Sequence, residues 1–414
     1  MAKIIYFFRS EIIYFTKSIS PNARRIMVSN TIRALSNPLM GIFMNAFVWR
    51  ATNSLLAVSF FNMSQFVGLP VGFFLNGLML RKVHIEKVFA FGAALTGLMS
   101  LVLVIAGSSN AQLIPLYGFF WGVGRGFYWG NRNYLELQET TNEWRQYFYG
   151  LLTSIHSVAN IIIPFMAGWF IVLVQYFGIL SVASAYWALF GIAFVLMMLS
   201  AKVIWKGGFE TPAPKIISRL GIFPFWGKRR LLNIAAGLFD GTEYVAVLLV
   251  LYVLGNEGVL GTISSVTAIC VAAALYGYGR NVTLSHAKRT ILSAGLVFLL
   301  CALSLIFLRQ EYAAGIYFIG IGLALKFFQV AADPTLLSLA DEEMNGKNEE
   351  RYSLIFDNEL FLNIGRLLGI SIIVGLVFFS SERTGFFYAP LIFSALHLIF
   401  LMLFMNKSVK EFTL

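Results

Sequence analysis

Apolar residues gather into long runs that recur from one end of the chain to the other, separated by short polar segments. A helix needs about 20 consecutive apolar residues to cross a bilayer. Windows of that length occur at 26–49, 53–80, 86–108, 112–138, 145–176, 179–205, 231–254, 258–278, 289–308, 312–340, 352–380 and 385–405. We therefore predict an all-α integral membrane protein with twelve transmembrane helices. Pro70 and Pro164 lie inside these windows and mark the expected kinks.

Composition agrees with this pattern. Of the 414 residues 58% are hydrophobic and only 12% are charged, whereas a globular domain carries about 25% charged residues. A soluble enzyme, a secreted disulfide scaffold and a disordered protein are thereby excluded. Cys270 and Cys301 lie inside spans without a second Cys or a His at ligand spacing, so we expect neither a disulfide framework nor a metal site, and no cofactor.

The basic residues indicate the orientation of the chain in the membrane. Of the 31 Lys and Arg residues, five lie inside spans and three (Arg50, Arg309, Arg383) lie in loops on one side, which leaves 23 for the termini and loops of the other side. Such a bias marks the cytoplasmic side. We expect a multi-pass protein of the cell (inner) membrane with both termini in the cytoplasm. The net charge of +11 thus reflects topology, and we expect no nucleic-acid partner.

The chain divides into four segments. Residues 1–25 form an expected interfacial amphipathic helix, because Arg9 and Glu11 interrupt the apolar run that a signal peptide would need. Residues 206–230, with two prolines and a basic cluster, form an expected cytoplasmic linker. This linker separates two six-helix bundles, 26–205 and 231–414.

The two bundles have the marks of an internal duplication. Arg24-Arg25 opens the first span of one half as Arg229-Arg230 opens that of the other, 205 residues later. The motif that begins at Asn142 is echoed by the one that begins at Asn348, 206 residues later. Two matches at nearly one offset predict pseudo-symmetric halves.

Ten charged residues remain inside the spans. Each costs about 2.5–3.5 kcal/mol to place at a helix centre on the translocon scale, so we expect them to face one another or water. They fall in spans 1, 4, 7, 10 and 11, whereas spans 3, 6, 9 and 12 carry none. They recur at steps of three or four, on one helix face: Arg33; Arg125, Arg132 and Glu136; Asp240 and Glu243; Lys326 and Asp333; Glu359 and Arg366.

This period of three helices resembles the major facilitator superfamily, in which the first helix of each three-helix unit surrounds a central cavity and the third faces lipid. The loop motif of that family is altered here, since Asn76 stands near the position where an acid is expected before Arg81-Lys82. A drug-antiporter signature in the fifth span is reduced to the segment from Pro164 to Gly168. The resemblance implies a secondary transporter that works by alternating access, and not an enzyme.

We assign roles to the polar stripes on this basis. Four acids are the expected proton-coupling groups: Asp240, Glu243, Asp333 and Glu359. The expected substrate-binding residues are Arg33, Arg125, Tyr128, Trp129, Tyr244, Lys326, Gln329 and Asn363. We expect Arg132, Glu136 and Arg366 to act in gating or in structural ion pairs; a structural interpretation is open for the other charges as well.

The resulting hypothesis is a monomeric, H⁺-coupled transporter of a small organic solute, with export by antiport slightly favoured by the Pro164 to Gly168 segment. Alternatives are uptake by symport, a lipid flippase or scramblase on the same fold, and a sensor that binds ligand without turnover. A flippase would need a lateral opening beside the charged site. The sequence Gly122-Val-Gly124-Arg-Gly126 imitates a nucleotide-binding pattern, but it lies in an apolar helix without a preceding strand, so we expect close helix packing there instead.

Overall fold

The computed structural model describes residues 19–107, 110–140, 145–212, 214–218, 220, 224, 226–281, 286–308, 311–344 and 351–410. Residues 1–18, which make up most of the expected interfacial helix, lie outside the described residues. So do Arg309 and the starts of the two loop motifs at 142 and 348.

In the described part of the chain the secondary structure is helical, without a strand, and follows the twelve predicted spans. The helices of the first half are α2 (Pro21–Pro38), η1 (Leu39–Phe43) and α3 (Met44–Thr52), which together make the first span, α4 (Leu55–Met79), α5 (Ile85–Ala106), η2 (Ala111–Leu113), α6 (Ile114–Glu139), α7 (Arg145–Tyr176) and α8 (Val182–Trp205). Those of the second half are α9 (Lys228–Asp240) and α10 (Glu243–Leu254), which together make the seventh span, α11 (Glu257–Asn281), α12 (Ala287–Leu308), α13 (Glu311–Met344), α14 (Arg351–Phe379) and α15 (Glu382–Lys410).

Ten of these helical segments are long and apolar enough to cross a membrane by composition alone. The two spans outside that set are the first one, which is divided into three pieces, and α6, whose polar stripe lowers its mean hydropathy. Both are explained by charge, because the first span contains Arg33 and α6 contains Arg125, Arg132 and Glu136. A polar helix is tolerated in a membrane when its neighbours cover it.

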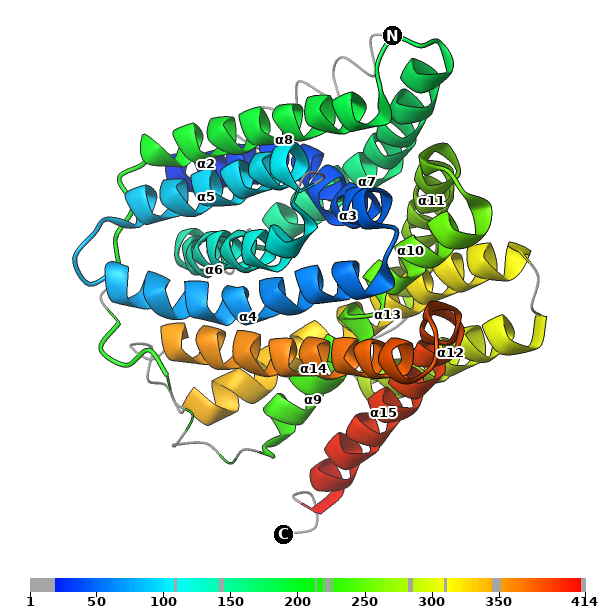
Figure 1. Cartoon of the computed structure of the whole chain (residues 1–414). Coiled ribbons are helices and arrows are strands. Elements are labelled where there is room, and N and C mark those ends of the chain that lie inside the picture. Colours follow the sequence, from blue (N-terminus) through cyan, green and yellow to red (C-terminus); the bar gives the residue numbers. More distant parts are fainter. Residues whose placement is uncertain are drawn as a thin grey trace, which may run out of the picture.

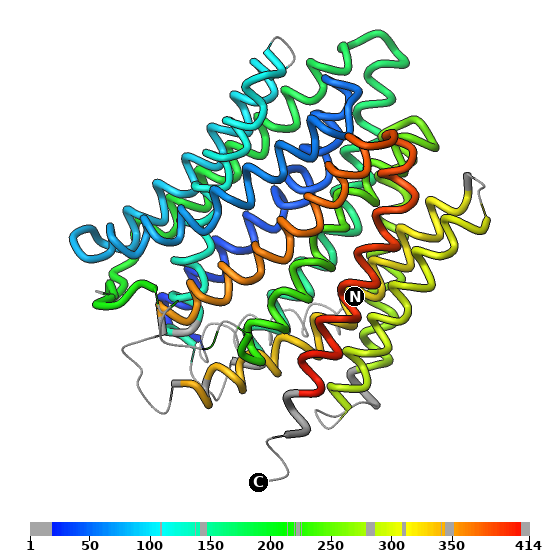
Figure 2. The backbone as a smooth tube through the Cα atoms, turned by 60° about the horizontal axis from the view of Figure 1, so that its bottom comes forward, coloured from blue at the N-terminus to red at the C-terminus, as the bar shows by residue number. Residues whose placement is uncertain are grey.

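The six spans from α2 to α8 form one half (the N-half), and the six from α9 to α15 form the other (the C-half). In Figure 1 the N-half runs from blue to green and the C-half from green to red, with α4 and α14 side by side between them. Figure 2 shows the same division along the chain trace. We call the end of the molecule that carries the 206–227 connection the linker end, and the opposite end the far end.

Glycines bring α6 into close contact with its neighbours. A Cβ on Gly126 would lie 2.7 Å from the Phe73 nitrogen of α4, and one on Gly124 would lie 2.7 Å from the Thr96 nitrogen of α5. Gly122 approaches the backbone of α4 in the same way. Only glycine permits such a separation, so the prediction that this glycine pattern serves helix packing is confirmed.

The first helix of each half is interrupted near its middle. In the N-half, α2 passes into the π-helical turn η1 directly after Pro38, which has no N–H to donate to the helical ladder. In the C-half, Gly241 and Thr242 form a turn between α9 and α10. The repeat offset pairs Gly241 with Ser36, which lies just before η1, so the interruptions are nearly equivalent. The helices α4 and α7, in contrast, continue through Pro70 and Pro164.

The halves are fastened together at the far end. The Arg50 guanidinium donates to both carboxylate oxygens of Glu257, at 2.8 and 3.0 Å, and to the Gly255 carbonyl at 2.6 Å. Tyr186 donates to the same carboxylate at 3.1 Å. Glu257 is 3% exposed, so a buried carboxylate of the C-half is bonded to two side chains of the N-half at the far end.

Candidate substrate and proton site

A continuous chain of polar side chains crosses the C-half at the interruption between α9 and α10. Asp240, the last residue of α9, accepts from Arg366 of α14 at 2.6 Å. Arg366 also donates to Glu359, at 3.3 Å. On the other side of Asp240, Gln329 of α13 donates to it at 3.5 Å and accepts from Lys326 Nζ at 2.8 Å.

Asn363 braces this chain on α14. Its amide donates to Glu359 Oε1 at 2.9 Å, and its carbonyl oxygen accepts from Arg366 at 3.2 Å. The structure therefore joins six of the residues selected from sequence: Asp240, Lys326, Gln329, Glu359, Asn363 and Arg366.

Two further carboxylates lie near these polar side chains. Glu243 is exposed although the eight residues after it in α10 are buried. It lies in electrostatic range of Asp240, Lys326, Arg366 and Arg125. Asp333 of α13 is also exposed and lies in range of Lys326 and Asp240. Since Glu243 is in range of Arg125 of the N-half, it borders the region between the halves, which we call the interdomain space.

Arg125 is a charged N-half residue that approaches this site. Its guanidinium carbon lies 5.0 Å from the centre of the Trp121 ring, and it is in electrostatic range of Arg366, Glu359 and Asp240. Among the described residues Arg125 forms no salt bridge. A half-buried cation without a bonded acid is costly unless a ligand completes it, so Arg125 is the strongest candidate for an anion contact.

The N-half has its own polar network, centred on Glu136. This carboxylate accepts from Arg132 at 2.7 Å, from Asn30 at 2.7 Å and from Tyr149 at 3.3 Å. Glu136 is 4% exposed. The network joins α2, α6 and α7 at the linker end of the N-half, with two donors on Oε1 of Glu136 and one on Oε2.

Arg33 and Tyr128 belong to the interior of the N-half, in contrast to the expected direct contact with substrate. Arg33 is 4% and Tyr128 1% exposed. The guanidinium carbon of Arg33 lies 3.4 Å from the centre of the Tyr128 ring, and Nη1 donates to the Met197 sulfur at 3.1 Å. Tyr128 in turn donates to Asn30 at 3.1 Å. The Tyr128 ring and the Met197 thioether enclose Arg33, so it lies behind the residues that border the interdomain space.

Two other residues chosen from sequence, Trp129 and Tyr244, lie near the interdomain space, and so does His156. Trp129 is partly exposed, and the centre of its ring lies 4.7 Å from the Arg132 guanidinium carbon. His156 of α7 lies against the backbone of Asn30, in electrostatic range of Lys326. Tyr244 is 4% exposed, and its hydroxyl lies beside Ser59 of α4, which places it at the contact between the halves.

The two walls differ in formal charge. Of the ten intramembrane charges selected from sequence, the N-half holds three cations and one acid, and the C-half holds two cations and four acids. With all ten ionised the N-half set is positive by two and the C-half set negative by two. The members are Arg33, Arg125, Arg132 and Glu136 on one side, and Lys326, Arg366, Asp240, Glu243, Asp333 and Glu359 on the other.

Sequence reasoning missed a buried charge cluster at the linker end of the C-half. Arg229 and Arg230, which we counted as loop cations, begin α9 and are 0% and 1% exposed. Asp357 accepts from Arg229 at 2.7 Å and from Arg230 at 2.6 Å, and Glu343 accepts from Arg229 at 2.8 Å. Arg229 also donates to Asn358. No sequence signal links these positions, because the partners lie on separate helices that are far apart along the chain.

The altered loop motif at Asn76 also has a partner in the other half. Asn76 donates to the Tyr352 hydroxyl of α14 at 2.8 Å, and this hydroxyl donates to the Phe73 carbonyl at 2.7 Å. The Arg81 side chain donates to the carbonyls of Pro214 and Lys215, both at 2.9 Å. The interdomain linker is therefore attached to the linker end of α4.

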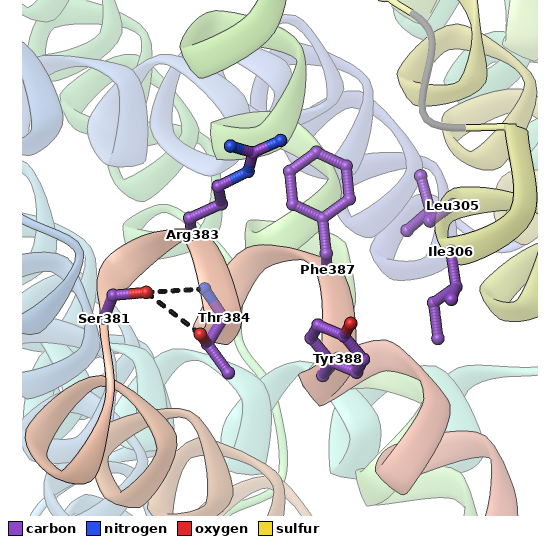
Figure 3. Close-up of a pocket in the computed structure, with 7 residues that line it drawn as sticks. All are labelled: Leu305, Ile306, Ser381, Arg383, Thr384, Phe387 and Tyr388. Atoms are coloured by element: carbon purple, nitrogen blue, oxygen red, sulfur yellow. Dashed lines mark hydrogen bonds between the residues drawn. The ribbon is translucent and has the colours of Figure 1, made fainter.

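A separate pocket of about 360 Å³ lies at the far end, between α12 and α15. Figure 3 shows Arg383, Phe387 and Tyr388 of α15 around it, with Ser381 bonded to Thr384 at the start of that helix. The pocket shares no residue with the hydrogen-bonded polar side chains around Asp240. Among the described residues no group of three or more His, Cys, Asp or Glu side chains has the arrangement of a metal site.

Comparison with known sequences finds a relative of similar length. The protein named "Uncharacterized protein YqgE" of Bacillus subtilis (strain 168) is 26% identical over 358 residues, which cover 85% of this chain and 82% of that protein. No protein-family model matches the chain.

Comparison with solved structures identifies the fold. PepTSo, a transporter of the POT family, superposes with a TM-score of 0.67 at 13% identity and covers 94% of this chain and 98% of its own. FucP, a major facilitator superfamily transporter crystallised in the outward conformation, superposes with a TM-score of 0.59 at 15% identity and covers 92% and 98%. The chain therefore has the major facilitator fold, with two six-helix halves.

Proposed function

We propose that this chain, which has the major facilitator fold, is a secondary active transporter that carries a small organic anion across the membrane by alternating access. The observation that supports this function is the series of hydrogen-bonded charged and polar side chains around Asp240. It lies where the first helix of the C-half is interrupted, and Arg125 approaches it from the N-half without a bonded acid. Transporters of this fold bind substrate at the interface between their repeats, near the bilayer midplane.

The proposed anion contacts are Arg125 on the N-half and Lys326 on the C-half. Lys326 has a neutral amide, Gln329, as its hydrogen-bonded partner in the described structure. A substrate carboxylate or phosphate between the two cations would match their charge and add charge-assisted hydrogen bonds. Trp129 and Gln329 border the same space and are proposed to contact the rest of the substrate.

The proposed coupling ion is H⁺, carried by the C-half acids. A proton on Asp240 would remove its ion pair with Arg366 and free that guanidinium for Glu359 or for the substrate. Glu243 and Asp333 are exposed and lie in electrostatic range of Asp240, so they are the proposed path by which the proton arrives. The charge pattern thus links proton uptake to a rearrangement of the substrate wall.

Alternating access requires a far-end gate and a linker-end gate. The Arg50–Glu257 contact crosses between the halves at the far end, and the Asn76–Tyr352 contact crosses at the linker end. We propose that the linker end faces the cytoplasm, because the positive residues gather there. Breaking one contact while the other holds would expose the site to one side at a time.

For direction we propose export by proton antiport. Pro164 and Gly168, which resemble part of an antiporter signature, lie at the contact between α7 and α11, where a Cβ on either glycine of the pair Gly168 and Gly261 would meet the opposite backbone. This segment therefore belongs to an interface that must move during transport, as a direction-setting element would.

The test begins with the purified full-length protein in detergent. A thermal-shift screen at two pH values, over organic anions, cations and neutral compounds, identifies binders. The protein is then reconstituted in liposomes with a pH-sensitive dye inside, and each binder is added with and without a pH gradient.

We expect anions to raise the unfolding temperature most, and their transport to move protons. Arg383→Lys at the far-end pocket is a matched control for Arg125→Lys, because both change one guanidinium to an ammonium. Solute movement without proton movement would reject the coupling. Binding without any movement would reject the transporter in favour of a sensor.

A further inference from the structure

Two seams between the halves, α4–α14 and α7–α11, differ toward the linker end. On one side, α4 and α14 have contacts along their length. At the far end the Leu55 nitrogen donates at 2.7 Å to Glu382, which begins α15 just after α14, and at the linker end Asn76 donates to Tyr352. Phe74 and Phe356 pack near the linker end, with ring centres 6.1 Å apart. In the middle, the Arg366 guanidinium carbon of α14 lies 5.0 Å from the centre of the Phe66 ring of α4.

On the other side, α7 and α11 meet closely in their far-end halves. A Cβ on Gly258 would lie 3.2 Å from Val172, and Trp169 donates to Thr262 at 3.0 Å. Gly168 and Gly261 approach each other's helix backbone there. The far-end half of this seam is therefore as tight as a glycine contact permits.

Helical periodicity shows that the same faces are uncovered toward the linker end. Gly150 precedes Gly168 by about five full helical turns, so both lie on one face of α7. A Cβ on Gly150 would nevertheless meet nothing within 4 Å. On α11, Ile269 lies three helical turns beyond Gly258 on the same face, and it is 51% exposed.

The surroundings of this opening are those of the bilayer interior. Val158 and Ile162 of α7 are 55% and 47% exposed, and Val266 of α11 is 42% exposed. Exposed aliphatic side chains on both flanks face lipid in a protein with this fold. Between them, Ser154 and Thr153 of α7 are exposed hydroxyl side chains, which makes the edge of the opening polar.

Behind the opening lie positive charges. His156 of α7 is in electrostatic range of Lys326, Arg132 and Arg33. Lys326 lies beside α11 because its neighbour Phe327 packs against the Tyr278 ring, with centres 5.2 Å apart. A group that enters between α7 and α11 therefore meets Lys326, whose hydrogen-bonded partner is a neutral amide.

We propose that the substrate is a membrane amphiphile, with an anionic head group that enters through the open linker-end half of the α7–α11 seam while its apolar tail stays in the bilayer. This inference rests on the proposed transport function and narrows its substrate class. The polar edge suits a head group, the aliphatic flanks suit a tail, and Lys326 and Arg125 suit the negative charge. The contacts along the α4–α14 seam make the entry one-sided.

The test follows lipid movement in liposomes that contain the full-length protein. The probe is phosphatidylglycerol with a fluorescent label on one acyl chain, and dithionite added outside quenches the label only in the outer leaflet. Labelled phosphatidylcholine, whose head group is zwitterionic, is the comparison lipid. We expect the protein to move phosphatidylglycerol several-fold faster than protein-free liposomes do, and faster than it moves phosphatidylcholine.

Gly150→Trp fills the opening and is expected to return the rate to near that of protein-free liposomes. Gly191→Trp is the matched control, because this glycine of α8 also has nothing within 4 Å of a built Cβ and lies away from the seam. We expect it to keep the wild-type rate. If Gly150→Trp does not fold, Gly150→Cys in a background with Cys270 and Cys301 replaced by Ser is labelled with a bulky maleimide after reconstitution, with the same expectation.

The possible outcomes distinguish failure of the amphiphile inference from failure of the proposed transport function. If a water-soluble anion moves with protons and Gly150→Trp leaves that movement unchanged, while phosphatidylglycerol moves as in empty liposomes, the amphiphile inference is overturned and the transporter stands. Equal rates for Gly150→Trp and Gly191→Trp would overturn entry through the seam. If neither solute nor lipid moves, the transport function itself is rejected.

Discussion

The two halves border the interdomain space with the same kind of interrupted helix, but their intramembrane charges are opposite in sign. In both, the first helix is interrupted at a nearly equivalent position, by Pro38 in the N-half and by Gly241-Thr242 in the C-half. The C-half interruption has acids on both of its edges, Asp240 and Glu243, and the N-half interruption has none. The two halves thus share the backbone break while their charges differ.

This difference indicates which half titrates and which half binds the anion. In the N-half Glu136 is 4% exposed and receives three hydrogen-bond donors from the protein itself, two on Oε1 and one on Oε2. In the C-half Asp240 and Glu359 are partly exposed, and Glu243 and Asp333 are exposed. We therefore assign titration to the C-half and anion binding to Arg125 of the N-half together with Lys326.

The largest expected effect comes from Asp240→Asn, which keeps the shape of the side chain and its contact with Gln329 but cannot titrate. We expect loss of essentially all pH-gradient-driven accumulation, with substrate binding retained. The measurement is uptake into liposomes with and without a pH gradient, alongside a binding titration. If Asp240→Asn still transports uphill at the wild-type rate, Asp240 is not the coupling residue, and Glu243, Asp333 or Glu359 must carry the proton.

The next effect in size comes from Arg125→Lys, which keeps the charge but loses the planar guanidinium that binds a carboxylate or phosphate through two donors. A charge-assisted hydrogen bond is worth about 1.5–3 kcal/mol, so substrate affinity should fall roughly 10- to 100-fold. The thermal-shift titration measures this fall, and Arg383→Lys should leave affinity unchanged. Wild-type affinity in both Arg125→Lys and Lys326→Gln would show that the anion binds elsewhere.

Glu136→Gln tests whether the N-half acid is structural. The change leaves Arg132 without its ion-pair partner but keeps an acceptor for Asn30, and breaking a buried charged hydrogen bond costs about 1–3 kcal/mol. We expect a lower unfolding temperature and intact proton coupling in the protein that remains folded. If coupling disappears instead while the unfolding temperature stays unchanged, the division of tasks between the walls is wrong.

The smallest effect is expected at the far end. Arg50 is 39% exposed in its side chain, and partly exposed ion pairs contribute about 0–1 kcal/mol. Arg50→Gln should therefore shift the balance only moderately toward an open far end. Spin labels at positions 53 and 380, in a background without Cys270 and Cys301, would report a longer distance in a larger fraction of molecules. An unchanged distance distribution would show that the aromatic contacts of Trp49 with Tyr252 and Phe386 hold this end closed.

Local periodicity determined much of what could be known in advance. Twelve helices, the linker between two halves and the polar stripes follow from runs of apolar residues and from steps of three and four, because a bilayer imposes helix length and a helix imposes which residues share a face. The stripe on α6 and the glycine packing of Gly122, Gly124 and Gly126 were predictable for the same reason.

What depends on distance through space was decided by the tertiary structure alone. Sequence spacing within one helix cannot say that Arg366 binds Asp240, that Arg229 and Arg230 enclose Asp357, or that Arg33 turns into the N-half. These partners lie on different helices, far apart along the chain, and either of two faces of a helix can turn inward until its neighbours are placed. The unequal seams have the same origin: α7 carries a glycine at both 150 and 168, yet only the packing of α11 decides that one is covered and the other open.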